Sequence, residues 1–422
     1  MLYCIGRWLI FYMEMQMGKY IYLMKVEADA NNNKYYEMVE NDGGMFTAKW
    51  GRVGSNPQTK DFPMRDWDKK YKSKTKKGYN DITEMISKVK KESGLKDISD
   101  SLIADIMSFL LQASSSNVAE NYMVKADSVT QKQVDEAQGI LDTVAKKLNV
   151  TSLKNETVDE INSELQKLFT VIPRKMKKVK DHLLSDTDLD VAKRLLTTEQ
   201  DNLDSMAASV QMNAVTDELS DEEVEEKTIL DILGVSIERV TSDEERVIKK
   251  ELGDIKDKYY RAIKVTHHKS RKLFEENVES SSNKKTELLW HGSRNENFIG
   301  ILQKSLLIRP SGAVYTGSMF GDGIYFANKA RKSYGYTSGR GSYWARGNSN
   351  KAFMALFEVH LGNEYHIKHH SSECYKFSAD YLAKKGGYDS VFAHGGADLR
   401  NDEKIVYRSN QTTIKYLVEL RG

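Results

Sequence analysis

The spacing of apolar residues changes twice along the chain, and each change marks a different kind of predicted structure. Residues 18–96 contain two short strand-like segments, Lys19–Val26 and Met45–Trp50, and the turn-forming run Asp42–Gly44 directly precedes the second. Strands joined by tight turns are typical of an antiparallel sheet. The first region is therefore predicted to be a small β-rich domain.

Residues 97–228 carry apolar side chains at every third or fourth position, which is the period of an amphipathic helix. Candidate N-caps precede the first three predicted helices: Ser99 or Asp100, Thr130 with Gln133, and Thr157 with Glu160. Pro173 ends the third helix, and a fourth helical pattern runs from about residue 187 to 212. We expect a helical bundle whose apolar stripes form its core, followed by a solvated acidic linker or loop at residues 217–227.

Residues 229–422 mix strand and helix patterns. Leu230–Val240 and Lys351–Leu361 are candidate strands, and apolar residues alternate along the last strand, at Ile414, Tyr416 and Val418. The whole chain is therefore predicted to be a multidomain α+β protein.

The amino-acid composition limits the class of protein further. The 422 residues are 40% hydrophobic and 29% charged, with a formal net charge of +2, as expected for a folded chain of several domains. Two cysteines, Cys4 and Cys374, exclude a disulfide-built fold and a cysteine-rich zinc finger, and they suit a reducing compartment. No apolar run reaches the roughly 18 residues of a membrane span. Residues 1–17 are interpreted as a disordered or over-extended N-terminus rather than a signal peptide.

Local charge is more informative than net charge. Residues 45–96 contain 14 Lys or Arg against 6 Asp or Glu, with aromatic residues interleaved. Such a stretch fits a face that contacts phosphates, although a solvated lysine-rich helix would have the same composition.

Short motifs carry the candidate chemistry. The third region contains HGS at 291–293, MFGDGIYFA at 319–327, KS at 332–333 and EKIVY at 403–407, and the first region contains WGRVG at 50–54. The glycines have neither P-loop nor dinucleotide-fingerprint spacing. In this order the motifs resemble the poly(ADP-ribose) polymerase family, and the helical stretch with FTVIP at 169–173 resembles its regulatory helical domain. The resemblance implies a WGR domain at 18–96, a regulatory helical domain at 97–228 and an ADP-ribosyltransferase catalytic domain at 229–422.

The resemblance implies NAD⁺ as substrate, cleaved between nicotinamide and ribose, and no metal. His291, Tyr325 and Glu403 match the catalytic H-Y-E set of polymer-forming members, with Glu403 stabilising positive charge on the ribose. The implied NAD⁺-binding residues are His291, Gly292, Ser293, Asn297, Gly300, Ser333 and Tyr336.

Trp50 and Arg52 match the family residues that contact the sugar-phosphate of a DNA end or nick. The resemblance thus implies a monomeric, nuclear, DNA-break-activated polymerase that modifies proteins, itself included, in a DNA-damage response. It resembles the short DNA-dependent members without zinc fingers. Two alternatives stay open: a catalytically silent DNA-end-binding protein, which the H-Y-E set argues against, and a DNA-independent mono-ADP-ribosyltransferase, which the WGR signature argues against.

Some positions depart from the family pattern. Leu307 stands where an arginine near the adenine is common, with Arg309 two residues later; Ser318 replaces a tyrosine; and Asn401 replaces an aromatic residue near the acceptor site. We expect these changes to affect donor affinity and polymer length or branching, and not the class of reaction.

The spacing of His366, His369, His370 and Cys374 would permit a metal site. We do not predict one, because these residues lie in a variable region of the family and no second ligand cluster accompanies them.

Overall fold

The computed structural model describes residues 18–27, 32–41, 43–53, 56–83, 94–148, 150, 152–308, 319–342 and 347–422, so residues 1–17 lie outside it. The chain divides into two compact units. The first takes in the described residues of Met1–Lys91, Ala119–Leu141 and Ser152–Asp188, and the second those of Glu92–Val118, Asp142–Thr151 and Leu189–Gly422. Strands, helices and several sheets confirm the predicted multidomain α+β class. The three-domain division stays a prediction.

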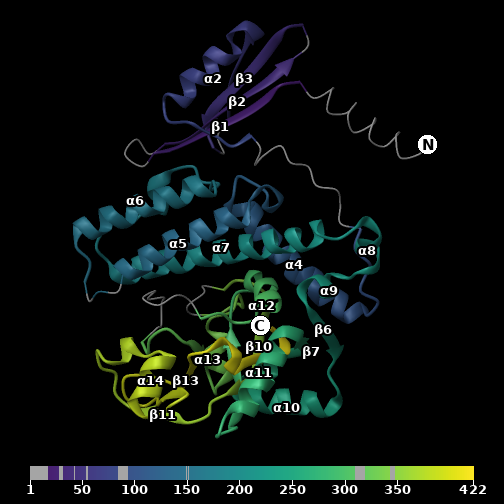
Figure 1. Ribbon diagram of the computed structural model, residues 1–422, viewed down its shortest axis with the longest axis vertical. Helices are drawn as coiled ribbons and strands as arrows, with labels where there is room; N and C mark the ends of the chain where they lie inside the picture. Colours follow the sequence, from purple (N-terminus) through teal and green to yellow (C-terminus); the bar gives the residue numbers. More distant parts are fainter. Residues whose placement is uncertain are drawn as a thin grey trace. The chain divides into compact units, whose positions relative to one another are not determined.

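The first unit contains a five-stranded antiparallel sheet in the order β4-β3-β2-β1-β5 (Figure 1). Its elements are β1 (Tyr20–Glu27), β2 (Asn32–Asn41), β3 (Met45–Arg52), β4 (Gln58–Pro63), α2 (Trp67–Thr75) and β5 (Asn80–Asp81). The two predicted strands are confirmed. Gly43 and Gly44 turn the chain between β2 and β3 with φ values of 84° and 74°, which favour glycine. Trp67 of α2 packs over one face of the sheet, against Phe46.

Four long helices follow, as the periodicity predicts: α4 (Ser101–Asn121), α5 (Gln131–Lys147), α6 (Asn155–Val171) and α7 (Leu189–Asp217). Asp100, rather than Ser99, caps α4, because its Oδ1 accepts hydrogen bonds from the Leu102 and Ile103 amides at 2.9 and 3.2 Å. Thr130 and Gln133 form their predicted capping box before α5.

The capping box predicted at Thr157 is wrong. Helix α6 begins at Asn155, and its N-cap Lys154 makes no side-chain cap hydrogen bond. The acidic run is not simply a loop, since α8 (Asp221–Glu226) forms within it on a capping box of Ser220 and Glu223.

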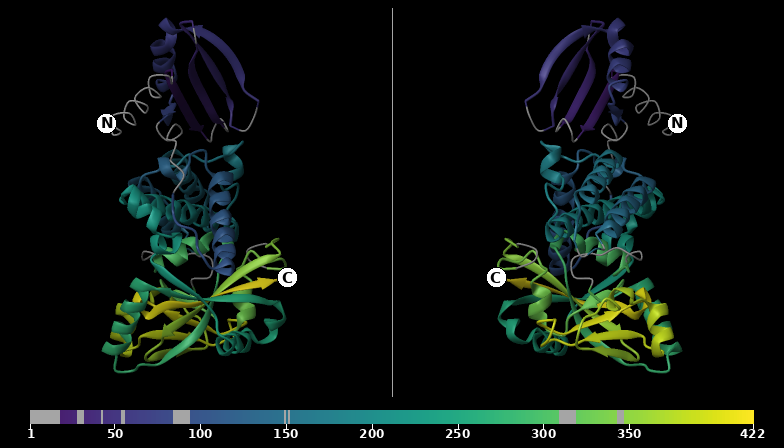
Figure 2. Two further views of the ribbon diagram at one scale, coloured as in Figure 1. Left: turned by 90° about the vertical axis from the view of Figure 1, so that its right-hand side faces the viewer. Right: turned by 90° about the vertical axis from the view of Figure 1, so that its left-hand side faces the viewer.

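Two sheets build the rest of the second unit (Figure 2). The larger has the order β6-β7-β14-β10-β8 and the smaller β11-β12-β13-β9. The strands are β6 (Val235–Arg239), β7 (Tyr259–His267), β8 (Thr286–Gly292), β9 (Ile324–Phe326), β10 (Lys351–His360), β11 (Glu364–Ile367), β12 (Ser390–Ala393), β13 (Glu403–Val406) and β14 (Thr412–Arg421). The helices are α9 (Ile229–Leu233), α10 (Ser242–Leu252), α11 (His268–Ser280), α12 (Phe298–Lys304), α13 (Ala330–Tyr334) and α14 (Ala379–Gly386).

The strands predicted at Lys351–Leu361 and at the C-terminus are confirmed as β10 and β14. The strand predicted over Leu230–Val240 is only half correct. Thr228 forms a capping box with Asp231, so the first half becomes α9, and Gly234 ends that helix at φ 69° before β6 starts.

The apolar stripes of the helical region are buried, as predicted. Ile103, Ile106 and Leu110 of α4 share one core with Phe353 and Phe357 of β10. Ala208 of α7 and Leu302 of α12 belong to the same core. The long helices α4 and α7 therefore both contribute to the core that includes strand β10. In the described part of the chain, no helix is both long and apolar enough to cross a membrane.

Candidate active site

The two sheets of the second unit meet where the predicted catalytic residues lie. Trp290 of β8 and Ala327, just after β9, exchange backbone hydrogen bonds of 2.9 and 3.0 Å. Strand β9 pairs with β13, which begins at Glu403. The end of β8, the strand β9 and the start of β13 are thereby brought together, although they are far apart in sequence.

His291 is held in one orientation by its surroundings. Its Nδ1 lies 3.3 Å from the Tyr325 carbonyl oxygen, and the rings of Phe326 and Phe357 stand edge-on to it, each with a 6.1 Å centroid separation. Burial lowers the pKa of His291 to about 4, so the imidazole is neutral near pH 7. With Nδ1–H donating to the carbonyl, Nε2 is left as an acceptor suited to a hydroxyl group.

Position 292 must be glycine because helix α13 lies close to it. A Cβ at this position would lie 1.9 Å from the carbonyl oxygen of Ser333, so no larger residue fits. The Ser333 hydroxyl donates a 3.1 Å hydrogen bond to the Trp290 carbonyl, and its lone pairs can still accept a hydrogen bond from an amide. The structure thus brings together the two residues predicted to hold a carboxamide.

The two predicted tyrosines, Tyr325 and Tyr336, differ in their surroundings. The hydroxyl of Tyr325 donates to the Gly321 carbonyl and accepts from the Phe320 amide, both at 2.9 Å, and burial raises its pKa well above the usual range. Tyr336 remains 37% exposed. Burial and, to a smaller extent, the charge of Glu403 raise the pKa of Tyr336 to about 12, which keeps its hydroxyl protonated.

Glu403 is mostly buried, and only one of its two carboxylate oxygens has a partner among the described residues. One carboxylate oxygen, Oε1, forms an ion pair with the ammonium group of Lys332. The other oxygen, Oε2, is buried and accepts no hydrogen bond from the described residues. A buried acceptor without a donor is costly, so a ligand hydroxyl at this position would be stabilised. Sequence reasoning noted Lys332 only as part of a motif and missed this pairing.

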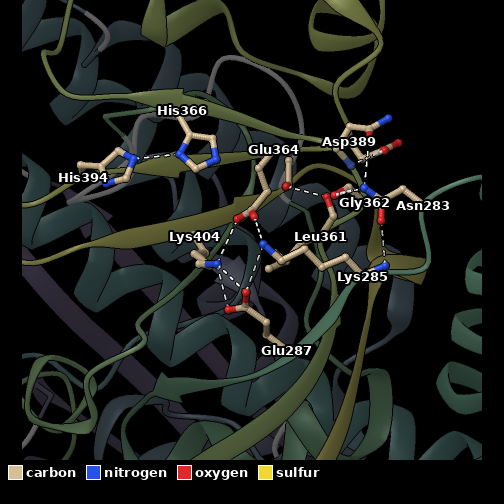
Figure 3. Close-up of polar contacts among 12 residues, drawn as sticks. Asn283, Lys285, Glu287, Leu361, Gly362, Glu364, His366, Asp389, His394 and Lys404 are labelled. Carbon is tan, nitrogen blue, oxygen red and sulfur yellow. Dashed lines mark hydrogen bonds and ion pairs between the residues drawn. The ribbon is translucent and has the colours of Figure 1, made fainter.

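Lys404, the next residue on β13, fixes the strand from its other face. Its ammonium group lies 2.9 Å from Glu287 Oε1 and 3.0 Å from Glu364 Oε1, and its side chain is only 5% exposed (Figure 3). Glu364 also pairs with Lys285. Because Glu403 and Lys404 alternate on the strand, this buried network holds the backbone that presents Glu403.

The remaining predicted NAD⁺-binding residues face α7. The Asn297 side-chain amide donates to Ser293 Oγ at 3.1 Å and to Asp201 Oδ1 of α7 at 2.9 Å. A Cβ on Gly300 would lie 3.6 Å from the Cβ of Ala208, also on α7. The helix therefore occupies the side of the site where the adenosine contacts were predicted.

Asp201 was missed by sequence reasoning. Burial, and after it the charge of Asp204, raise its pKa to about 7, although the Asn297 hydrogen bond and the charge of Arg294 act in the opposite direction. An acidic residue facing inward from an amphipathic helix is the only sequence signal that could have pointed to it.

The DNA-binding residues predicted in the first unit lie on β3. Trp50 and Arg52 are two positions apart, so they point to one face of the sheet, where Trp50 stacks on Tyr36 with a centroid separation of 5.9 Å. Arg52 pairs in register with Lys34 of β2, which pairs with Lys25 of β1. Three cationic residues thus lie side by side across the sheet.

The departures from the family pattern are only partly visible. Leu307 is 58% exposed and Asn401 is half-buried, and Arg309 and Ser318 lie outside the described residues.

The four candidate metal ligands make separate contacts. His366 Nδ1 is 2.9 Å from His394 Nε2 (Figure 3). In contrast, His370 Nε2 is 2.9 Å from the Met319 carbonyl oxygen. His369 lies near Asp398, and the buried Cys374 sulfur accepts from the Ser371 amide. Within the described ranges, no group of three or more His, Cys, Asp and Glu side chains could hold a metal ion.

Comparison with known proteins decides the family. Residues 242–422 match the poly(ADP-ribose) polymerase catalytic domain, and residues 20–85 match the WGR domain. A putative poly [ADP-ribose] polymerase-like protein, 100L of Invertebrate iridescent virus 6, is 34% identical over 167 residues, which are 39% of this chain and 87% of the viral protein. The chain belongs to the poly(ADP-ribose) polymerase family.

Two further relatives show the extent of the likeness. Uncharacterized protein 101L of the same virus is 35% identical over 184 residues, covering 43% of this chain and 74% of that protein. Poly [ADP-ribose] polymerase 2 of Arabidopsis thaliana is 26% identical over 488 aligned positions, covering 97% of this chain and 74% of that protein. As a poly(ADP-ribose) polymerase family member, the chain is an ADP-ribosyltransferase that uses NAD⁺ as its substrate.

Proposed function

We propose that this family member is a DNA-break-activated poly(ADP-ribose) polymerase that modifies proteins, itself included, with release of nicotinamide. The observation that carries the catalytic part is Glu403. Its carboxylate combines an ion pair to Lys332 with a buried oxygen that accepts no hydrogen bond from the described residues. A ribose hydroxyl would donate a hydrogen bond to this oxygen.

The donor site follows from the surrounding residues. The backbone of Gly292 and the Ser333 hydroxyl hold the nicotinamide carboxamide, with Tyr325 and Tyr336 as walls. His291 accepts a hydrogen bond from the adenosine ribose through Nε2. On the same side, the adenosine portion is contacted by Ser293, Asn297 and Gly300.

The reaction breaks the bond between ribose C1′ and the nicotinamide nitrogen, and nicotinamide leaves with the electron pair. Positive charge develops on the ribose, and the Glu403 carboxylate stabilises it electrostatically. An acceptor oxygen then bonds to C1′ and loses its proton. When the acceptor is a hydroxyl of a previously added ADP-ribose, the chain grows.

Helix α7 supports a restrained resting state. Because Asp201 is hydrogen-bonded to Asn297 and Ala208 faces Gly300, α7 occupies space that the adenosine portion needs. DNA binding would favour the displaced helix by a differential free energy, typically about 1–3 kcal/mol for coupled sites.

The first unit supports DNA as the activator. Lys25, Lys34 and Arg52 form a row of cations across three neighbouring strands. A DNA phosphate would be attracted to this row, and Trp50 offers a flat face to a terminal nucleotide. A role in DNA repair, and hence a nuclear location, follows from this proposal.

The test is the initial rate of nicotinamide release, with and without blunt or nicked DNA, for the full-length protein, Arg52→Ala and Ala208→Leu. Wild type should be stimulated by DNA, and Arg52→Ala should respond less. Ala208→Leu should raise the rate without DNA because the larger side chain cannot seat against Gly300. A rate that DNA does not change would refute activation and favour the mono-ADP-ribosyltransferase alternative.

Glu403→Gln tests polymer formation. The amide keeps the shape of the side chain but loses its charge, so elongation should fall by roughly 100-fold or more while NAD⁺ binding persists. Product length on denaturing gels measures this. Normal polymer ladders from the variant would refute the role, and absence of any transfer by wild type would favour a catalytically silent DNA-binding protein.

A further inference from the structure

A short segment between α6 and α7 is strongly basic. Five of the seven residues Arg174–Lys180, here called the basic connector, are Lys or Arg, and none is acidic. Met176 and Val179 are buried, at 3% and 0% exposure, whereas Lys175, Lys177 and Lys178 are exposed. The connector therefore packs through its apolar residues and presents its lysines to solvent.

Hydrogen bonds join the backbone of the basic connector to the five-stranded sheet of the first unit. The side-chain amide of the fully buried Asn33, on β2, donates to the carbonyl oxygens of Arg174 and Met176. The Lys175 amide donates to the Asn121 carbonyl at 2.8 Å, and the Arg174 guanidinium lies 4.6 Å from the centre of the Tyr122 ring. A loop that served only as a solvated linker would not need these contacts.

These ties place the connector beside the predicted DNA-contacting row. The Asn33 carbonyl accepts from the Val53 amide at 2.9 Å, and the next residue, Lys34, pairs in register with Arg52. Neighbouring Cα atoms are about 3.8 Å apart, so the connector and Arg52 lie at the same end of β2 and β3. Asn33 and Lys34 point to opposite faces, which puts cations on both sides of this strand end.

Two of the connector's lysines have no ion-pair partner among the described residues. Lys177 and Lys178 form no ion pair with any residue that the structure describes. On the other face, Lys74 of α2 lies close to Lys34, and burial together with Lys77, Lys70 and Lys34 lowers its pKa. A polyanion with closely spaced charges would stabilise cations arranged in this way.

We propose that the basic connector is a second DNA-contact surface, which binds backbone phosphates of the same DNA end that Trp50 and Arg52 bind. The proposal rests on the proposed DNA-binding function of the WGR domain. Contacts of this kind are independent of base sequence and depend on salt.

The test uses the full-length protein and a fluorescently labelled blunt-ended duplex, with affinity measured by anisotropy over a series of NaCl concentrations. The variant is Lys175→Ala, Lys177→Ala and Lys178→Ala combined. The charge-matched control is Lys154→Ala, Lys269→Ala and Lys272→Ala, three exposed lysines elsewhere on the chain. Circular dichroism confirms that both proteins are folded, which we expect because every substituted side chain is exposed.

Each lost phosphate contact lowers the slope of log affinity against log salt by about 0.9. The connector variant should therefore lose about 2 to 3 from this slope and bind roughly 10- to 100-fold more weakly at low salt, whereas the control should match wild type. A connector variant that matches the control would overturn the inference.

Arg52→Ala separates this inference from the proposed function. If Arg52→Ala weakens binding and the connector variant does not, the WGR domain binds DNA and the connector inference is wrong. If neither change weakens binding, DNA binding by this surface is itself refuted, and the connector inference fails with it.

Discussion

Replacing Gly292 with alanine tests whether the contact between β8 and α13 builds the nicotinamide site. The added Cβ would lie 1.9 Å from the Ser333 carbonyl oxygen and 2.7 Å from its carbonyl carbon. Real side-chain carbons essentially never approach closer than 3.0 Å, so the strand and the helix must separate by roughly 1 Å. Both neighbouring atoms are backbone, and a side-chain rotation cannot relieve the overlap.

The magnitude follows from the role of the two residues. Gly292 and Ser333 are proposed to grip one carboxamide group, and a displacement of about 1 Å in a reacting geometry can cost on the order of 100-fold in rate. We therefore expect kcat/KM for nicotinamide release to fall by about 100-fold, which corresponds to roughly 2.7 kcal/mol of transition-state stabilisation.

The assay is steady-state nicotinamide release with saturating DNA, together with a thermal melt to confirm folding. Gly139→Ala is the control, because a Cβ at that position in α5 meets nothing within 4 Å. It should keep wild-type kinetics and can only gain helix stability. A folded Gly292→Ala protein with wild-type kcat and KM would show that the close approach of Ser333 does not shape the donor site.

Two further predictions use buried charges. Because the folded pKa of Asp201 is raised from 3.8 to about 7, its contribution to α7 docking is complete below about pH 4 and is lost as pH rises through about 7. The rate of nicotinamide release without DNA should therefore increase between about pH 6 and pH 8. The variant Asp201→Asn should flatten this rise. If the variant keeps the wild-type pH profile, Asp201 is not the source of the rise. Lys404→Ala removes the buried cation that pairs with the buried Glu364 and the partly exposed Glu287, and leaves Lys285 as their remaining partner, so the free energy of unfolding should fall by up to about 3–5 kcal/mol in denaturant titrations. Lys249→Ala, which removes one exposed ion pair, should cost no more than about 1 kcal/mol, and equal losses for the two variants would refute the buried-network argument.

Local patterns in the sequence determined most of the elements. Helix periodicity located α4 to α7, and apolar alternation located β14, because those patterns reflect which side of each element faces a core. Asp100 and the pair Thr130–Gln133 were recognisable as caps since a cap involves residues only a few positions apart. The prediction failed at Leu230–Val240, which was given as one strand, because the capping box at Thr228 starts a helix there instead.

The motifs also indicated which residue types the reaction needs, through their order along the chain. How those residues are held was decided only by the tertiary structure. The ion pair of Lys332 with Glu403 spans 71 positions, and the hydrogen bond of Asn297 with Asp201 spans 96. Neither leaves a periodic trace in the sequence, because each depends on two sheets meeting or on a helix packing across a site. The buried acceptor of Glu403 and the raised pKa of Asp201 arise from that packing, since desolvation is a property of the folded surroundings and not of the residue itself.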